Sequence, residues 1–329
     1  MQQPIPWEKV NRTEPLHVLI TGAAGQIGYN LCFLIGRGFL FDCDVILHLY
    51  DLNDMALKGL SMELTDCCLP KLKGIISTTE IALAFSNVDV AIIVAGVPRK
   101  PGMQRSDLIN VNKKVMEMNG KALGTYSNKD VRVVVVANPA NTNAYVICKT
   151  SGIPPEHITA LTRLDQNRAT AFVANEVGCQ PEFVHNIIVW GNHSNTMQPD
   201  LSYSYLADQN GIKPLANCIE DFDAFTEKVR CRGEEVISTR KASSAGSAAH
   251  AICQHIKDWI YGTKPGIMVS MGVSSNGEYG IDTGLFYSMP VTCSEGEYHI
   301  VDSLVIEPRI KDSLILSELE LIDERNIVN

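Results

Sequence analysis

Between residues 16 and 136, short apolar segments alternate with longer amphipathic stretches, and this alternation constrains the fold more than any other feature. The apolar segments read LHVLIT, VILHLY, VDVAIIVAG and VRVVVVA, and their β-branched residues favour strands. Because these segments are apolar almost throughout instead of alternating with polar residues, both faces of the sheet must be covered. The sequence therefore predicts an α/β fold, a Rossmann-like doubly wound parallel sheet with helices on both faces.

After about residue 151 the pattern changes, which indicates a second domain. We expect a helix that opens near Leu164, a strand over 185–190, helices over about 222–238 and 243–261, and a final helix over about 312–323. Between 266 and 300, strand-like runs are interrupted by SSNGEYG and CSEGEY, which are typical of antiparallel hairpins. The predicted parts are an N-terminal tail at 1–15, a nucleotide-binding domain at 16–157 and an α+β substrate domain at 158–329.

Composition excludes several classes of function. The chain has 329 residues, 45% of them hydrophobic. Its net charge is -9, and the sequence contains no basic run that could bind a phosphate backbone, so we expect no nucleic acid partner. No apolar run reaches the roughly 18 residues of a membrane span, and the first fifteen residues do not form a secretory signal. The ten cysteines are scattered without a CxxC pair, so we predict reduced thiols, no metal site and a cytoplasmic protein.

A glycine-spaced turn joins the first strand to the first helix. Gly22, Gly25 and Gly28 have a GxxGxxG spacing, and Gln26 and Ile27 lie between the last two glycines. Glycines at such a turn let the backbone approach a pyrophosphate, which rests on the helix N-terminus. The spacing differs from the commoner GxGxxG, so the turn alone is weak evidence, but its place after a strand strengthens it.

An acidic residue follows the second strand. Asp51 lies about 20 residues beyond the last glycine, where a carboxylate can hold the ribose hydroxyls of NAD. The neighbouring Leu52 and Asn53 offer no positive charge for a 2′-phosphate, which favours NAD over NADP. The alternative is that Asp51 only caps the end of its strand.

Two arginines lie in the segment VPRKPGMQRSDL, which follows the third apolar strand. Arg99 and Arg105 could belong to a lid whose closure removes them from water, and each would then need an anion or a developing oxyanion as partner. The alternative is a solvated surface loop.

Four further polar residues follow elements of the two domains. Asn138 ends the strand VRVVVVA, His193 follows the strand that ends in Trp190, and Asp165 and Arg168 share a helix face if LTRLDQNRAT is helical. Oxidation of a hydroxyl-bearing carbon needs a base, and histidine is suited to that task near neutral pH. A carboxylate such as Asp165 can orient the imidazole, while an arginine can anchor a substrate carboxylate in a bidentate manner. The alternative for Asp165 and Arg168 is an exposed ion pair of little value.

Taken together, the strings TGAAGQIG, MELTDC, PRKPGMQRSDL, NPANTN, LTRLDQNRA and WGNHS resemble the cytosolic-type branch of the lactate/malate dehydrogenase family. The resemblance runs from about Leu16 to the last helix and implies NAD-dependent, reversible hydride transfer between a 2-hydroxy acid and its keto acid. It also implies a homodimer in the cytoplasm.

The family pattern assigns roles to individual residues. It implies that His193 exchanges the proton, that Asp165 is its partner, that Arg168 clamps the C1 carboxylate and that Arg105 polarises the carbonyl. Asn138 would hydrogen-bond the substrate. The implied cofactor-binding residues are Gly22, Gly25, Gln26, Ile27, Gly28, Asp51, Asn112, Val136 and Asn138.

Arg99 is the residue that would select the substrate. An arginine at this position resembles the family members that act on dicarboxylates, whereas relatives acting on lactate carry an uncharged residue. A second substrate carboxylate would also remove the penalty of burying an unpaired arginine. The pattern therefore implies malate and oxaloacetate as substrates, and it leaves open another 2-hydroxy acid or an NAD-binding sensor without activity.

Two features depart from the family pattern. Gly246 stands where cytosolic-type members often have a larger apolar residue, which would loosen the pocket near the nicotinamide. The N-terminal tail is also longer than usual, and the sequence assigns it no role.

Overall fold

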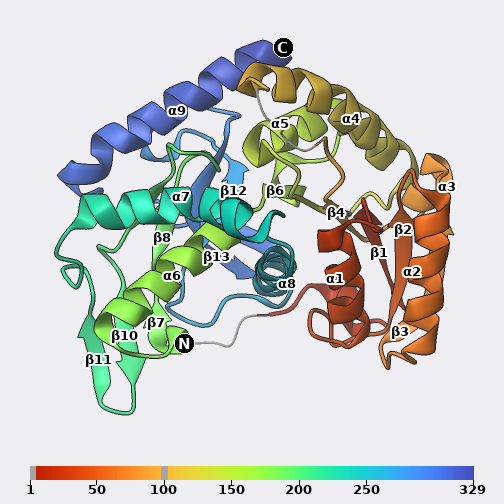
Figure 1. Ribbon diagram of the computed structural model, residues 1–329, viewed down its shortest axis with the longest axis horizontal. Helices are drawn as coiled ribbons and strands as arrows, with labels where there is room; N and C mark the ends of the chain where they lie inside the picture. The colour runs from red at the N-terminus through yellow and green to blue at the C-terminus, as the bar shows by residue number, and fades with distance from the viewer. Residues whose placement is uncertain (1–4, 98–102) are drawn as a thin grey trace.

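The computed structural model describes residues 5–97 and 103–329. Its main feature is a nine-stranded sheet in the order β14-β13-β12-β6-β5-β4-β1-β2-β3 (Figure 1). Six neighbouring strands are parallel: β1 (Leu16–Thr21), β2 (Val45–Tyr50), β3 (Leu72–Thr78), β4 (Val90–Ile93), β5 (Arg132–Val135) and β6 (Ile158–Ala160). The strand order reverses direction between β1 and β4, as in a doubly wound fold.

Alternate residues of the central strands face two separate cores. Val18 and Ile20 of β1 belong to the same cluster as Leu31 and Ile35, whereas Leu19 belongs to the cluster on the other face. The first face is covered by α1 (Gln26–Gly36), α2 (Asp54–Asp66) and α8 (Gly246–Tyr261), and the second by α3 (Ile81–Phe85), α4 (Arg105–Tyr126) and α5 (Ala140–Ser151). The prediction of a parallel sheet with helices on both faces is confirmed.

The second half of the chain extends the same sheet with antiparallel strands. β12 (Val269–Ser274), β13 (Phe286–Ser294) and β14 (Glu297–Ile300) pair in sequence, and β12 joins β6 through Gly272 and Ala160. The predicted hairpins between 266 and 300 are therefore confirmed. The predicted boundary at residue 157 falls just before β6, the last parallel strand.

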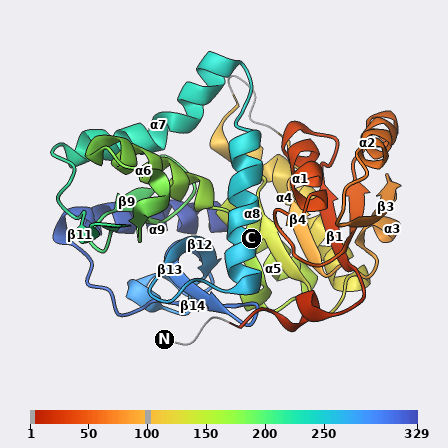
Figure 2. The same cartoon turned by 90° about the horizontal axis from the view of Figure 1, so that it is seen from below.

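Smaller sheets and long helices complete this half. β7 (Val184–His185), β10 (Tyr205–Asp208) and β11 (Gly211–Pro214) form one sheet, and β8 (Ile188–Trp190) pairs with β9 (Gln198–Asp200). The helices are α6 (Arg163–Val177), α7 (Phe222–Arg240) and α9 (Pro308–Val328). Figure 2 shows α8 running through the middle of the molecule, between α1 on one side and α6 on the other.

The prediction of one continuous strand over 185–190 is wrong, because β7 and β8 are separate. Asn186 lies between them with a φ of 57°, a left-handed conformation that asparagine tolerates better than most residues. Its side chain donates to the carbonyl of Gly266 and accepts from the backbone of Met268. The break therefore anchors the start of the β12 segment.

The described part of the predicted tail is packed against both halves of the chain, including a short 3-10 helix at Glu8–Asn11. Trp7 is 2% exposed, its backbone N–H donates to Ile260 at 2.7 Å, and its indole N–H donates to Asp130 at 3.2 Å. Lys9 pairs with the buried Asp89 at 2.9 Å. Residues 5–15 thus form a strap rather than a free tail.

All ten cysteines are free, in agreement with the expectation of reduced thiols. Burial raises the pKa of the Cys32 thiol, which keeps that group protonated and unreactive. No helix in the described ranges has the length and apolarity required to cross a membrane.

Candidate active site

The glycine turn lies at the carboxyl end of β1, and its backbone leaves no room for a side chain at Gly28. Gly22 has a φ of 67°, which favours glycine. A Cβ on Gly28 would lie 2.5 Å from the carbonyl oxygen of Gly22 and 2.6 Å from Cα of Ala23. Gly25 and Gln26, at the start of α1, are exposed, so this helix N-terminus is accessible to an anion. The cradle fits a pyrophosphate.

Asp51 lies next to this turn. Its carboxylate accepts the backbone N–H of Ala24 at 3.2 Å and that of Asn53 at 3.2 Å. The contact with Asn53 caps the end of the strand, which is the alternative role considered for Asp51. The contact with Ala24 places the carboxylate beside the glycine cradle. The two roles are compatible.

Asn112 is fully buried, and its amide is saturated by backbone groups. It accepts from the N–H of Val97 at 2.7 Å and donates to the carbonyls of Val97 and Asn138. Asn112 thereby joins the segment after β4 to the turn after β5. Asn138 itself is exposed, while Val136 is half-buried and hydrogen-bonded to Ile93 through its backbone.

His193, Asp165 and Arg168 meet as the sequence predicted. Nδ1 of His193 lies 2.5 Å from Oδ2 of Asp165, and Nη1 of Arg168 lies 3.3 Å from Oδ1 of the same carboxylate. The side chain of Asp165 is 1% exposed and that of Arg168 is 13% exposed, so the alternative of an exposed ion pair is wrong. Ser244 accepts a further hydrogen bond from Arg168.

The Asp165 contact decides which imidazole nitrogen can act. Because Nδ1 of His193 is engaged, Nε2 is left to meet a ligand. The imidazole is 22% exposed and therefore accessible to a ligand. A buried carboxylate behind a histidine also stabilises the imidazolium that forms when the ring takes a proton.

The backbone of the loop that carries His193 is fixed by residues to which the sequence reading gave no role. Asn141 accepts the N–H of His193 at 2.9 Å and donates to the carbonyl of Phe286 at 2.9 Å. Ser317 accepts the N–H of Asn192 at 2.7 Å. Both side chains are fully buried.

One pattern in the sequence could have predicted that α9 supports the loop of His193. Its buried positions are 310, 314, 317, 321, 324 and 328, a helical spacing in which two members, Ser317 and Glu324, are polar. Polar side chains on an otherwise apolar buried face must find partners, and here they bind Asn192 in the loop of His193.

Of the two arginines that the sequence placed in a possible lid, only Arg105 lies among the described residues. Arg105 begins α4, and its guanidinium pairs with Glu324 at 2.5 Å. No ion pair within the described residues joins it to Asp165. Arg99, with the rest of 98–102, lies outside the described residues.

Gly246 opens α8, and a Cβ there would have no heavy atom within 4 Å. A Cβ is therefore accommodated at this position.

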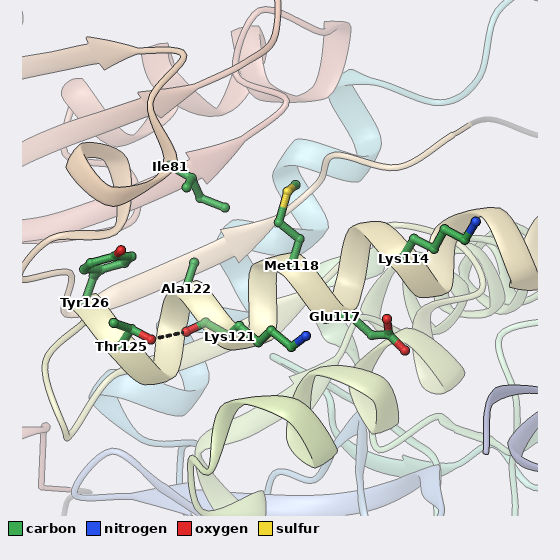
Figure 3. A pocket seen from close by; sticks show the side chains of 8 residues that line it. All are labelled: Ile81, Lys114, Glu117, Met118, Lys121, Ala122, Thr125 and Tyr126. Atoms are coloured by element: carbon green, nitrogen blue, oxygen red, sulfur yellow. Dashed lines mark hydrogen bonds between the residues drawn. The ribbon is translucent and has the colours of Figure 1, made fainter.

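A separate hollow of about 400 Å³ lies farther along α4 (Figure 3). It is lined by Ile81, Lys114, Glu117, Met118, Lys121, Ala122, Thr125 and Tyr126. None of the predicted site residues is among them. The contacts of His193 and the glycine cradle make their region the candidate active site.

Comparison with known families agrees with this geometry. Residues 16–160 match the NAD binding domain of lactate/malate dehydrogenases, and residues 162–328 match the alpha/beta C-terminal domain of the same enzymes. The chain belongs to the lactate/malate dehydrogenase family. Its cofactor is NAD, as the glycine turn and Asp51 predicted.

Individual relatives cover nearly the whole chain. The cytoplasmic malate dehydrogenase of Zea mays is 42% identical over 323 residues, which are 95% of this chain and 97% of that protein. The malate dehydrogenase structure from Naegleria fowleri has a TM-score of 0.90 at 40% identity, with 96% and 98% of the two chains covered. The Trichomonas vaginalis lactate dehydrogenase in complex with NADH and oxamate has a TM-score of 0.91 at 37% identity, with 95% and 98% covered.

Proposed function

We propose that the chain is an NAD-dependent malate dehydrogenase, which interconverts (S)-malate and oxaloacetate. The contact between His193 and the buried Asp165 at 2.5 Å, with Arg168 on the same carboxylate, is the observation that carries the proposal. Relatives named as malate dehydrogenases support the same activity.

His193 accepts and returns the proton of the C2 hydroxyl. In the direction of oxidation, Nε2 accepts the proton of the C2 hydroxyl, and Asp165 stabilises the imidazolium through Nδ1. In the reverse direction the imidazolium returns the proton to the carbonyl oxygen. NAD supplies the acceptor for the hydride of C2 when it is bound.

Arg168 anchors the substrate. Its guanidinium is held by Asp165 and Ser244, and a planar guanidinium binds a C1 carboxylate in a bidentate manner. Arg105 polarises the C2 carbonyl, and Asn138 donates a hydrogen bond to the substrate. Arg99 pairs with the second carboxylate, which makes the substrate a four-carbon dicarboxylate.

The glycine cradle holds the cofactor. We assign the pyrophosphate to the turn formed by Gly22, Gly25 and Gly28 with Gln26 and Ile27, and the ribose hydroxyls to Asp51. Asn112, Val136 and Asn138 complete the pocket, and Asn112 acts by fixing the backbone of its neighbours.

We further propose a cytoplasmic homodimer. The names of the plant relatives support the location. Met55 and Met62 lie seven residues apart on α2, are 74% and 66% exposed, and offer an apolar face for a second copy. Sedimentation equilibrium should give twice the chain mass, and Met55→Glu with Met62→Glu should give the monomer. A wild-type monomer at micromolar concentration would remove this part of the proposal.

The activity is tested by steady-state rates with oxaloacetate and with pyruvate, each combined with NADH and with NADPH. We expect oxaloacetate with NADH to give the highest kcat/KM. Faster turnover of pyruvate would assign another 2-hydroxy acid, and no turnover with NADH binding intact would indicate a sensor. Replacement His193→Asn should abolish turnover but leave NADH binding unchanged.

A further inference from the structure

The carboxylate of Glu324 holds Arg105 in this structure. Nε of Arg105 donates to Oε1 of Glu324 at 2.6 Å, and Nη2 lies 2.5 Å from the same oxygen. Glu324 is 3% exposed, whereas the side chain of Arg105 is 36% exposed. A second carboxylate, that of Glu320, lies 3.8 Å from Nε. The arginine thus neutralises a buried anion on α9, at the place where α9 approaches the start of α4 (Figure 1).

The same two carboxylates also bind the loop of His193. The amide of Asn192 donates to Glu324 at 3.0 Å and to Glu320 at 2.9 Å. Thr142, on α5, donates its hydroxyl hydrogen to Glu324, and the hydroxyls of Ser194 and Thr196 donate to Glu320. Asn192, before His193, is therefore hydrogen-bonded to both carboxylates near Arg105, and Ser194, after it, is hydrogen-bonded to Glu320.

Two groups compete for the guanidinium of Arg105. In the proposed function its guanidinium faces the substrate carbonyl, but in the structure its Nε and Nη2 face Glu324. Nε is the donor that is hydrogen-bonded to Glu324, and this N–H cannot be directed at a second group at the same time. If Arg105 turns its Nε edge toward the substrate, the pair with the nearly buried Glu324 is weakened or broken, which costs free energy.

We propose that Glu324 competes with the substrate for Arg105 and so sets the affinity of the enzyme for its dicarboxylate. Glu324 is a positioning residue that acts through Arg105 and touches neither substrate nor cofactor. The inference rests on the proposed role of Arg105. It implies that the natural enzyme binds its substrate less tightly than a variant without this negative charge.

The test is Glu324→Gln, which keeps the size and one acceptor oxygen of the side chain but removes the charge. Two readouts are needed: the Kd of tartronate, a dicarboxylate that the enzyme cannot reduce, for the NADH complex, and the KM and kcat for oxaloacetate. We expect tartronate Kd and oxaloacetate KM to fall by about tenfold while kcat changes less than about threefold. Melting temperature and NADH affinity report on folding.

Two further variants keep the test decisive. Asp323→Asn removes the same charge from the preceding residue of α9, which is exposed and lines a pocket together with Arg105 and Glu324, and it should leave Kd unchanged. Glu320→Gln should lower Kd by a smaller factor than Glu324→Gln, because Glu320 is more distant from Arg105. Should Glu324→Gln not fold, an unchanged or higher Kd for Glu320→Gln would count against the proposal.

The competing explanation is that Glu324 only supports the loop of His193. In that case Glu324→Gln would lower kcat and the melting temperature with tartronate Kd unchanged or raised, and the proposal would be overturned. In the background Arg105→Gln, Glu324→Gln should no longer tighten binding, since the competition is gone. If the wild type reduced no oxaloacetate and bound no tartronate, the proposed function would fail first, which separates the two failures.

Discussion

Asp165 is fully buried, and its contact with Nδ1 determines how the imidazole of His193 can act. Replacement Asp165→Asn keeps the shape of the side chain but removes the charge that stabilises the imidazolium. We expect kcat for oxaloacetate to fall by about three to four orders of magnitude, with NADH affinity unchanged. Steady-state rates and NADH fluorescence titration measure the two quantities. A loss of less than tenfold would show that Asp165 is not the partner of the proton acceptor.

Arg99 should control selectivity. With Arg99→Leu, the second carboxylate of oxaloacetate loses its cation, so we expect kcat/KM for oxaloacetate to fall by about 100-fold or more and that for pyruvate to rise. Parallel rate measurements on both keto acids check this expectation. Lys100→Leu, which removes a charge from the adjacent residue, is the control and should preserve the preference. An equal loss on both keto acids would assign Arg99 another role.

His255 provides a pH-dependent contribution to stability. Complete burial and the nearby Arg163 lower its pKa from 6.5 to about 3, while its Nε2 lies 2.9 Å from the hydroxyl of Thr159. Between these pKa values the unfolded chain binds a proton that the folded chain does not. Stability therefore falls as the pH drops below about 6.5.

The difference between wild type and His255→Gln isolates this effect, because other histidines with lowered pKa, such as His48, remain in both proteins. From about pH 7 to about pH 5, we expect the wild type to lose about 2 kcal/mol more unfolding free energy than the variant. Urea titrations at both pH values provide the measurement. Equal losses in the two proteins would mean that His255 titrates normally.

Among the helices and strands, the fully buried ones were the easiest to predict from the sequence. β1, β2, β4 and β5 were found because central parallel strands are apolar on both faces. β3 was missed, since this edge strand contains Lys73 and Gly74 and is largely half-buried. The final helix was expected over about 312–323 but spans Pro308–Val328. It begins earlier than expected because its first turn starts at a proline, a residue that is favoured at the first position of a helix.

The N-terminal strap had no pattern in the sequence, because its stability comes from tertiary contacts. The indole of Trp7 is buried against Gly296, where a Cβ would lie 2.5 Å from the ring, and Arg132 stacks over it at 5.0 Å. We expect Trp7→Ala to lower the unfolding free energy by about 3 to 5 kcal/mol. Chemical denaturation measures this, with the exposed Ile5→Ala as control. A loss below about 1 kcal/mol would mean that the strap adds little to stability.

At the scale of the whole molecule, the strand order brings together residues that are distant in the sequence. His193, in the loop after β8, meets Asp165, at the start of α6, and the motifs predicted that meeting. Glu320 and Glu324 come from a helix more than a hundred residues later, so only the folded chain shows that they hold Asn192. The meeting of His193 and Asp165 was predictable from the sequence motifs, whereas the partners that Ser317 and Glu324 bind in the His193 loop are seen only in the folded chain.

The most direct test of the central claim is a competition experiment. Equal concentrations of oxaloacetate and pyruvate are reduced in one tube with NADH that carries deuterium at the transferred position, and the products are counted by mass spectrometry. For a malate dehydrogenase we expect (S)-malate with deuterium at C2 as the dominant product, and no labelled product with His193→Asn. Labelled lactate in excess over labelled malate would contradict it.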